Sequence, residues 1–129
     1  MRLFVIAAVS SLVAATAVQA QDAGDPVAGA KVFRKCQACH VVNEEKNRVG
    51  PHLVGIIDRP IASVEGFNYS KAMTEYGEGG KVWDAETLTV YLRDPRGTVK
   101  GTKMAFAGLK KDDELVNVIA YLADPSAAE

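Results

Sequence analysis

FRKCQACHVV, residues 33–42, contains both cysteines of the chain and a histidine directly after the second one. Two residues separate Cys36 from Cys39, and His40 follows. On one helical turn the two thiols point the same way, so they can add to the two vinyl groups of one haem as thioethers, with the histidine beneath the iron. C-x-x-C-H is the attachment signature of c-type haem. The motif therefore predicts one covalent haem c, and the fold has to be built around it.

Three other uses of the two cysteines fit the sequence less well. A disulfide between them would close a loop over two intervening residues and would restrain the unfolded chain very little. A thiol–disulfide active site would normally follow a β-strand, whereas the preceding residues 28–35, AGAKVFRK, have a helical pattern. A zinc site needs four ligands, and only His52 remains to join the motif. Haem attachment uses all three side chains.

Residues 1–20, MRLFVIAAVSSLVAATAVQA, have the pattern of a secretory signal peptide. Arg2 precedes an apolar run, and the small side chains of Val18 and Ala20 suit a cleavage site. The run is shorter than the roughly 20 residues that cross a bilayer, and no basic cluster follows it. We therefore expect cleavage after Ala20 and one domain over residues 21–129, exported to the periplasm without stable membrane insertion.

Four helical stretches are predicted, and no alternating run is long enough to indicate a sheet. They are residues 26–39, residues 71–76 after the cap Ser70, the segment WDAETLTVYLRDP between the cap Asp84 and Pro95, and the segment DDELVNVIAYLADP from Asp112. Residues 41–69 and 95–110 are left without regular structure, which is more loop than a compact domain usually has. The sequence thus predicts an all-α fold of three main helices, short helices and long loops wrapped around a haem.

The second axial ligand is sought among the side chains that commonly bind haem iron, which are His52, Met73 and Met104. His52 lies in the loop that leaves the proximal side, so we interpret it as a solvated loop histidine. Met104 lies in a loop with glycines at both ends that can cross the far face of the haem. An iron–sulfur bond would anchor that loop, so Met104 is the expected ligand.

Five segments occur in the order and near-spacing of class I cytochromes c: CQACH, GPHLVGIIDR, GFNYS, WDAETLTVYLRDP and KGTKMAFAGL. The sequence most resembles the soluble bacterial cytochrome c2 type, which is close to mitochondrial cytochrome c, over residues 24–124. The resemblance implies that Cys36 and Cys39 carry the thioethers. It also implies that His40 and Met104 ligate the iron.

The same resemblance assigns roles to residues around the haem. The carbonyl of Pro51 is expected to accept the other ring N–H of His40, which fixes the orientation of the imidazole. Tyr91 is expected to point its hydroxyl toward the methionine sulfur. Three residues match positions that hydrogen-bond the haem propionates: Arg59, Tyr69 and Trp83. Three others match the crossing of the first and last helices: Gly29, Phe33 and Tyr121.

The predicted chemistry is one-electron transfer rather than enzymatic catalysis, because a His/Met-ligated haem has no open position for a substrate. The alternative, a haem site that binds external ligands, would need an open position on the iron. Class II cytochromes c have such a position, but they are four-helix bundles with the C-x-x-C-H motif near the C-terminus, whereas here the motif is near the N-terminus. The resemblance implies membrane partners of respiration or photosynthesis: the cytochrome bc1 complex, photosynthetic reaction centres or terminal oxidases. We expect a monomer that binds no nucleic acid.

Charge is unevenly distributed along the chain. Fifteen Lys and Arg residues stand against sixteen Asp and Glu, for a formal net charge of −1. Yet residues 95–111 contain five basic side chains and no acid, and residues 28–40 contain three and no acid. Both segments flank the predicted iron ligands. A positive face there would steer the protein toward an acidic docking face on a redox partner.

Overall fold

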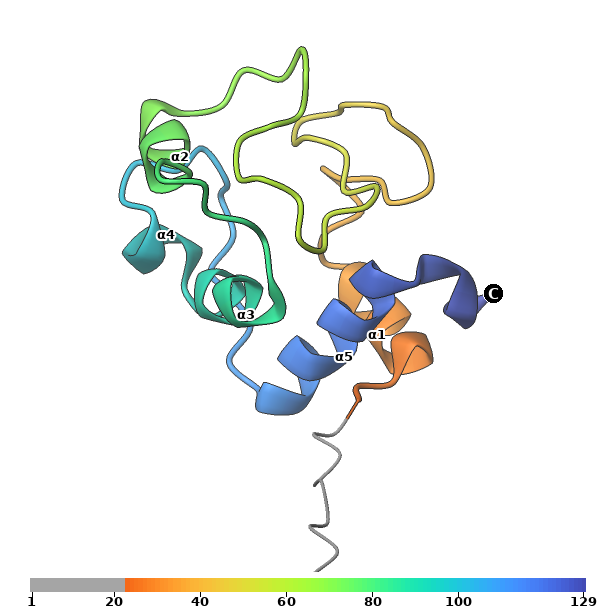
Figure 1. Ribbon diagram of the computed structural model, residues 1–129. Helices are drawn as coiled ribbons and strands as arrows, with labels where there is room; N and C mark the ends of the chain where they lie inside the picture. The colour runs from red at the N-terminus through yellow and green to blue at the C-terminus, as the bar shows by residue number, and fades with distance from the viewer. Residues whose placement is uncertain (1–22) are drawn as a thin grey trace, which may run out of the picture.

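The computed structural model describes residues 23–129, so the predicted signal peptide, residues 1–20, lies outside the described residues. Within 23–129 the chain forms five α-helices and a final 3₁₀-helix (Figure 1). They are α1 (Pro26–Phe33), α2 (Lys71–Tyr76), α3 (Ala85–Arg93), α4 (Pro95–Thr98), α5 (Asp112–Ala123) and η1 (Pro125–Ala128). No strand occurs in this range, and a single antiparallel bridge joins Pro60 to Val82. The predicted all-α class is confirmed.

Three helices begin at side-chain caps. Asp25, Ser70 and Asp84 each accept a hydrogen bond from a backbone N–H two or three residues further on, at the starts of α1, α2 and α3. Each cap satisfies one of the N–H groups that have no partner inside a helix. Helix α5 has no such cap, but three acids occupy its first turn, where the helix dipole favours negative charge. The predicted starts of all four helices are confirmed.

The predicted end of the first helix is wrong. Helix α1 ends at Phe33, and residues 34–39 form successive turns instead. The N–H groups of Lys35 and Cys36 bond to carbonyls three residues back, at 3.0 and 2.7 Å. This tighter winding is typical of the last turns of a helix, and here it carries the two cysteines.

The expectation that residues 95–110 lack regular structure is also wrong at their start, because they contain α4. Pro95 occupies its first turn, and the side chain of Asp94 accepts a hydrogen bond from Gly97 N at 3.0 Å. Proline suits the first turn of a helix because its missing N–H would have no partner there. The same proline therefore ends α3 and begins α4.

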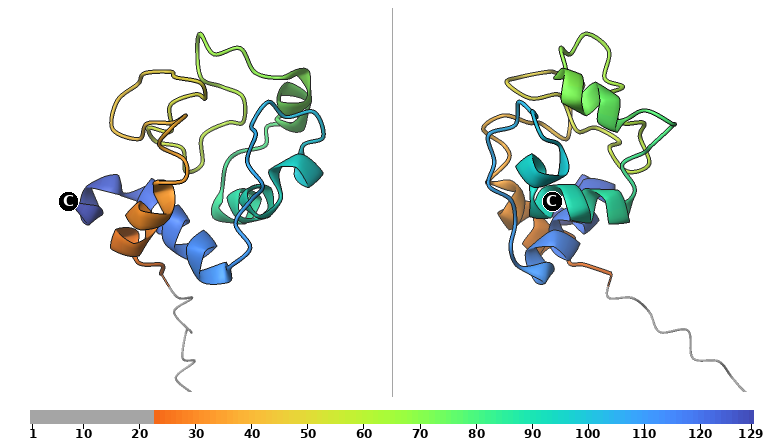
Figure 2. Two further views of the ribbon diagram at one scale, coloured as in Figure 1. Left: turned by 180° about the vertical axis from the view of Figure 1, so that it is seen from behind. Right: turned by 90° about the vertical axis from the view of Figure 1, so that its left-hand side faces the viewer.

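Helices α1 and α5 cross in direct contact (Figures 1 and 2). A Cβ atom built on Gly29 would lie 2.0 Å from the carbonyl oxygen of Asn117, so only glycine permits this approach. Beside the crossing, the rings of Phe33 and Tyr121 pack with centroids 5.3 Å apart. The predicted crossing is confirmed.

The loops form much of the molecule. In Figure 1 most of residues 41–69 lie above α1, α3 and α5, and backbone hydrogen bonds join Asp58 and Arg59 to Trp83, directly before the cap of α3. Buried side chains from the helices and the loops, among them Ile56, Trp83, Leu88 and Leu115, form one continuous core. None of the helices within residues 23–129 is long and apolar enough to cross a membrane.

Candidate functional site

A cavity of about 310 Å³ lies between the loops and helices α2 and α3. Its volume is in the range of small-molecule and cofactor pockets, roughly 300–1,000 Å³. Apolar side chains form much of its wall: Leu53, Ile56, Phe67, Met73, Leu88, Leu92 and Phe106. All nine predicted site residues line it: Cys36, Cys39, His40, Pro51, Arg59, Tyr69, Trp83, Tyr91 and Met104.

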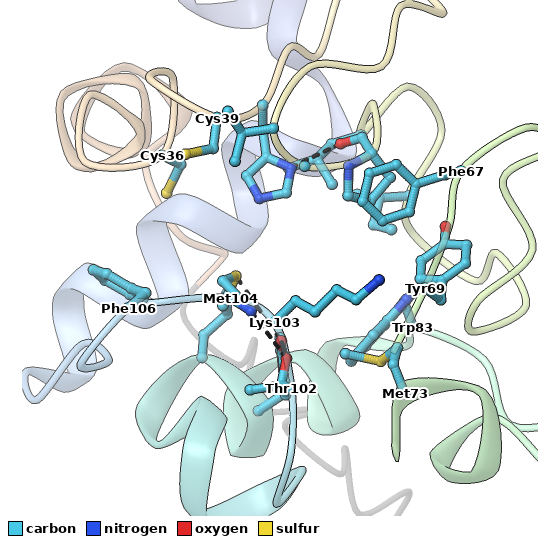
Figure 3. Close-up of a pocket in the computed structure, with 18 of the residues that line it drawn as sticks. Cys36, Cys39, Phe67, Tyr69, Met73, Trp83, Thr102, Lys103, Met104 and Phe106 are labelled. Atoms are coloured by element: carbon cyan, nitrogen blue, oxygen red, sulfur yellow. Dashed lines mark hydrogen bonds between the residues drawn. The ribbon is translucent and has the colours of Figure 1, made fainter. Parts of the chain in front are cut away.

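Cys36 and Cys39 lie together on one side of the cavity (Figure 3), and both are half-buried unpaired thiols. The N–H groups of Cys39 and His40 both bond to the carbonyl of Cys36 at 3.0 Å, which holds the three residues of the motif in one tight turn. The chain thus presents two thiols and an imidazole to the same cavity.

The surroundings of the cysteines disfavour the alternative chemistries. Burial raises the pKa of the Cys36 thiol to about 11, despite the opposing charge of Lys35. The reactive cysteine of a thiol–disulfide enzyme has a lowered pKa instead. A zinc site is disfavoured as well, because residues 23–129 contain no group of three or more His, Cys, Asp or Glu side chains that could hold a metal.

His40 is held by a hydrogen bond between its Nδ1 and the carbonyl oxygen of Pro51, at 2.7 Å. Because a carbonyl can only accept, Nδ1 carries the proton and Nε2 keeps its lone pair in the neutral ring. Burial lowers the pKa of His40, and this outweighs the opposite effect of the Pro51 hydrogen bond. The environment therefore favours the neutral imidazole, which is the form that binds metals.

The guanidinium of Arg59 is fixed by two backbone carbonyls. It donates from Nη1 to Val54 O at 3.0 Å and from Nη2 to His52 O at 3.1 Å. Its Nε is buried and has no hydrogen-bond partner in the described part of the chain. An unpaired buried donor costs about 1–3 kcal/mol, so an anionic group beside Arg59, such as a haem propionate, would relieve it. The donor set therefore fits a haem.

Tyr69 and Trp83 lie on the side of the cavity opposite the cysteines (Figure 3). The hydroxyl oxygen of Tyr69 accepts a hydrogen bond from Val64 N at 3.1 Å, so its own proton remains available to a ligand in the cavity. Burial raises the pKa of Tyr69, which keeps that proton on the oxygen at neutral pH. The side chain of Trp83 is buried and packs on Tyr91, with ring centroids 5.0 Å apart.

The expectation that His52 is solvated is wrong. The residue is half-buried, and its Nδ1 is buried without a hydrogen-bond partner among residues 23–129. The backbone N–H of His52 donates to the Asn47 side chain at 3.1 Å, and the carbonyl oxygen of His52 accepts a hydrogen bond from Arg59. The backbone of His52 thus supports the guanidinium, a role that sequence spacing does not indicate.

Met104 has polar neighbours that Met73 does not share. The hydroxyl of Tyr91 lies 3.9 Å from the Met104 sulfur and 3.3 Å from Thr102 Oγ1. The backbone N–H of Met104 donates to the same Thr102 oxygen at 3.3 Å. Met73 is also buried in the cavity wall, but it comes from α2 and lies beside Trp83 (Figure 3).

Two further residues of the cavity, Gly50 and Lys103, make contacts that the sequence does not indicate. Gly50 packs against the ring of His40. Lys103 donates from Nζ to Asn68 O at 2.8 Å and so ties the loop of Met104 to the loop before α2. The Lys103 contact joins segments 35 residues apart, and the Gly50 contact depends on how the loop after His40 folds back. Neither residue differs in type from an ordinary surface lysine or loop glycine.

Comparisons with known proteins agree on one family. The family profile described as Cytochrome c matches residues 26–125. The chain is 52% identical over 98 residues to cytochrome c-550 of Ancylobacter novellus, covering 75% of this chain and 92% of that protein. It is also 52% identical over 101 residues to cytochrome c2 of Afifella marina, covering 77% and 82%. The structure of cytochrome c2 from Rhodospirillum centenum superposes with a TM-score of 0.72 at 40% identity, covering 77% of this chain and 96% of that one.

Proposed function

Because the chain belongs to the cytochrome c family of electron carriers, we propose that it is a soluble one-electron carrier with one haem c attached through Cys36 and Cys39. The resemblance to class I cytochromes c, of the c2 type, is confirmed by these relatives and by the shared fold. Membership of the family implies a covalently bound haem c. One observation carries the residue assignment: every residue that the resemblance assigned to the haem lines one cavity.

We propose that His40 and Met104, which both line the cavity, would hold the haem iron. The bound haem supplies one-electron redox chemistry. Pro51 orients the His40 ring, the Tyr91 hydroxyl lies beside the Met104 sulfur, and Thr102 Oγ1 accepts a hydrogen bond from the backbone N–H of Met104. The apolar wall excludes water, which together with thioether ligation favours the ferrous form. If His40 and Met104 both held the iron, neither side chain would have to move during electron transfer, and the site would have no open position for a substrate.

We further propose that the carrier works in the periplasm after removal of residues 1–20, as a monomer that binds no nucleic acid. Its partners would be an electron donor of the bc1 type and an acceptor such as a photosynthetic reaction centre or a terminal oxidase. Lys35 and Lys103 line the cavity, and the basic segments around them suit acidic docking faces on those partners.

Mass spectrometry of the intact, denatured protein purified from the periplasm tests the attachment. The expected mass is that of the chain from Gln21 plus one haem. The Cys36→Ser/Cys39→Ser double variant provides the control, because it keeps His40 and the cavity but cannot form thioethers. Haem that leaves the denatured wild-type chain in acidified ketone would show that the attachment is not covalent.

A further inference from the structure

We propose that Gly50 is a positioning residue for His40: the space left by its missing side chain fixes the orientation of the imidazole ring. This inference rests on the proposed function, because it concerns the ring that ligates the iron there. Gly50 and His40 both line the haem cavity, and the nine residues between them, 41–49, bring them back into contact.

The contact covers one side of the ring. A Cβ atom built on Gly50 would lie 2.3 Å from Cε1 of His40 and 2.8 Å from both Nδ1 and Nε2. Real Cβ atoms do not approach other heavy atoms so closely, so any side chain at this position must displace the ring or its own backbone. The imidazole is rigid and attached at Cβ, so displacing it means rotating it.

The backbone at Gly50 does not itself require glycine. Its φ lies outside the left-handed region, in contrast to Gly55, whose φ is +61°, and Gly66, whose φ is +73°. Those two glycines have open space around an ideal Cβ, so their conformation alone explains them. At Gly50 the contacts of the built Cβ with the His40 ring are the feature that excludes a side chain.

The glycine and the ring cannot easily move apart, because hydrogen bonds join their two segments on either side. Gly50 N donates to the carbonyl of Cys39 at 2.9 Å, and Leu53 N donates to the carbonyl of Val41 at 2.7 Å. Between these bonds, His40 Nδ1 donates to Pro51 O at 2.7 Å. Pro51 therefore holds the edge of the ring, while Gly50 confines its face.

The orientation of an axial imidazole determines how the iron orbitals share unpaired spin with the haem, and groups around a ligand tune the metal in this way. The test compares Gly50→Ala and Gly50→Val with the wild-type holoprotein. The measurements are the hyperfine-shifted haem methyl signals in the ferric state and the midpoint potential. We expect the spacing of the four methyl signals to change in Gly50→Ala, with a shift in potential, and both changes to be larger in Gly50→Val.

Gly29→Ala is the matched control. Its Cβ would meet Asn117 O at 2.0 Å, a contact as severe as that at Gly50, but between α1 and α5 rather than on the ring. It should lower stability and leave the methyl pattern and the potential unchanged. Covalent attachment would keep the haem on a destabilised chain, so every variant that folds can be measured as the holoprotein.

Two outcomes would overturn the inference. One is a folded Gly50→Ala protein with wild-type methyl signals and potential. The other is failure of both Gly50 variants to fold while Gly29→Ala folds, because position 50 would then be needed for the fold and not for the ring. Absence of low-spin haem signals from the wild-type protein would instead contradict the proposed function.

Discussion

At the scale of single residues, the cavity contains the sulfurs of two methionines, Met73 and Met104, and the groups around the two side chains differ. Both backbone N–H groups donate to a hydroxyl, that of Met104 to Thr102 and that of Met73 to Ser70, but only Met104 has the Tyr91 hydroxyl 3.9 Å from its sulfur. Burial raises the pKa of Tyr91, so its hydroxyl keeps its proton and can donate toward the sulfur. Met73 is buried at 8% exposure in α2, where it fills the wall as an ordinary core methionine does.

We therefore predict that Met104→Ala removes the axial ligand and Met73→Ala does not. Ferric iron bound to a thioether gives a weak far-red absorption band, which should disappear in Met104→Ala and persist in Met73→Ala. Removal of the ligand should also let the ferrous protein bind carbon monoxide, which the wild-type protein should not do. A band that survives in Met104→Ala but vanishes in Met73→Ala would assign the ligand to Met73.

The residues around the proposed haem were predictable to different degrees. Cys36, Cys39 and His40 lie within one turn, so their spacing alone indicates their chemistry. Arg59 and Tyr69 were identified by resemblance, since nothing local separates them from surface or core residues. The sequence does not indicate the burial of His52 or the contact of Gly50 with His40, because both depend on how residues 41–53 fold back on the motif.

At the scale of helices, the starts were predictable and some of the ends were not. A cap is a contact within three residues, so Ser70 and Asp84 could be recognised from the sequence. The end of α1 has no glycine or proline to mark it, and the change to tighter turns follows Phe33 without a local signal. Helix α4 is only four residues long, too short to show any periodicity.

The crossing of α1 and α5 provides a stability prediction. Gly29→Ala should lower the free energy of unfolding by about 1–3 kcal/mol, because the added methyl group forces the two helices apart at Asn117. Val27→Ala is the control, since Val27 lies in the same helix with 49% of its surface exposed and should change stability by about 0.5 kcal/mol or less.

Denaturant unfolding of the holoproteins, followed by circular dichroism, measures both variants. Equal stability of Gly29→Ala and the wild-type protein would mean that the two helices can separate without cost. Such a result would contradict the role of Gly29 in the crossing, and it would also remove this variant as a control for Gly50.

At the scale of the whole molecule, the net charge conceals a local excess of basic residues in segments 28–40 and 95–111. Several of these side chains form an ion pair or a hydrogen bond. Lys35 forms an ion pair with Glu114 at 2.7 Å, and Lys110 donates to Arg93 O at 2.8 Å. Lys103 donates to Asn68 O. Such exposed contacts are weak, so these cations still contribute to the field of the protein. A substitution of Lys103, however, changes a hydrogen bond as well as a charge.

We predict that Lys103→Glu slows bimolecular electron transfer to an acidic redox partner more than Lys81→Glu does. Lys103 lines the haem cavity, whereas Lys81 lies 4.4 Å from the Tyr76 ring centroid and is not part of that lining. Rates measured by stopped flow should differ most at low salt, because electrostatic steering contributes about 10–10³-fold to association rates there. The difference should shrink near physiological ionic strength, where the Debye length is about 8 Å.

Lys103→Gln separates the two roles of this lysine. Like Lys103→Glu, it removes the ammonium hydrogen bond to Asn68, but it changes the charge by half as much. If steering dominates, its rate should fall between those of the wild type and Lys103→Glu at low salt, and all three rates should converge as salt rises. If the bond between the loops dominates, the two variants should be equally slow at every salt concentration. Equal effects of Lys103→Glu and Lys81→Glu would contradict a docking face at the haem cavity, because the response would then follow net charge and not its position.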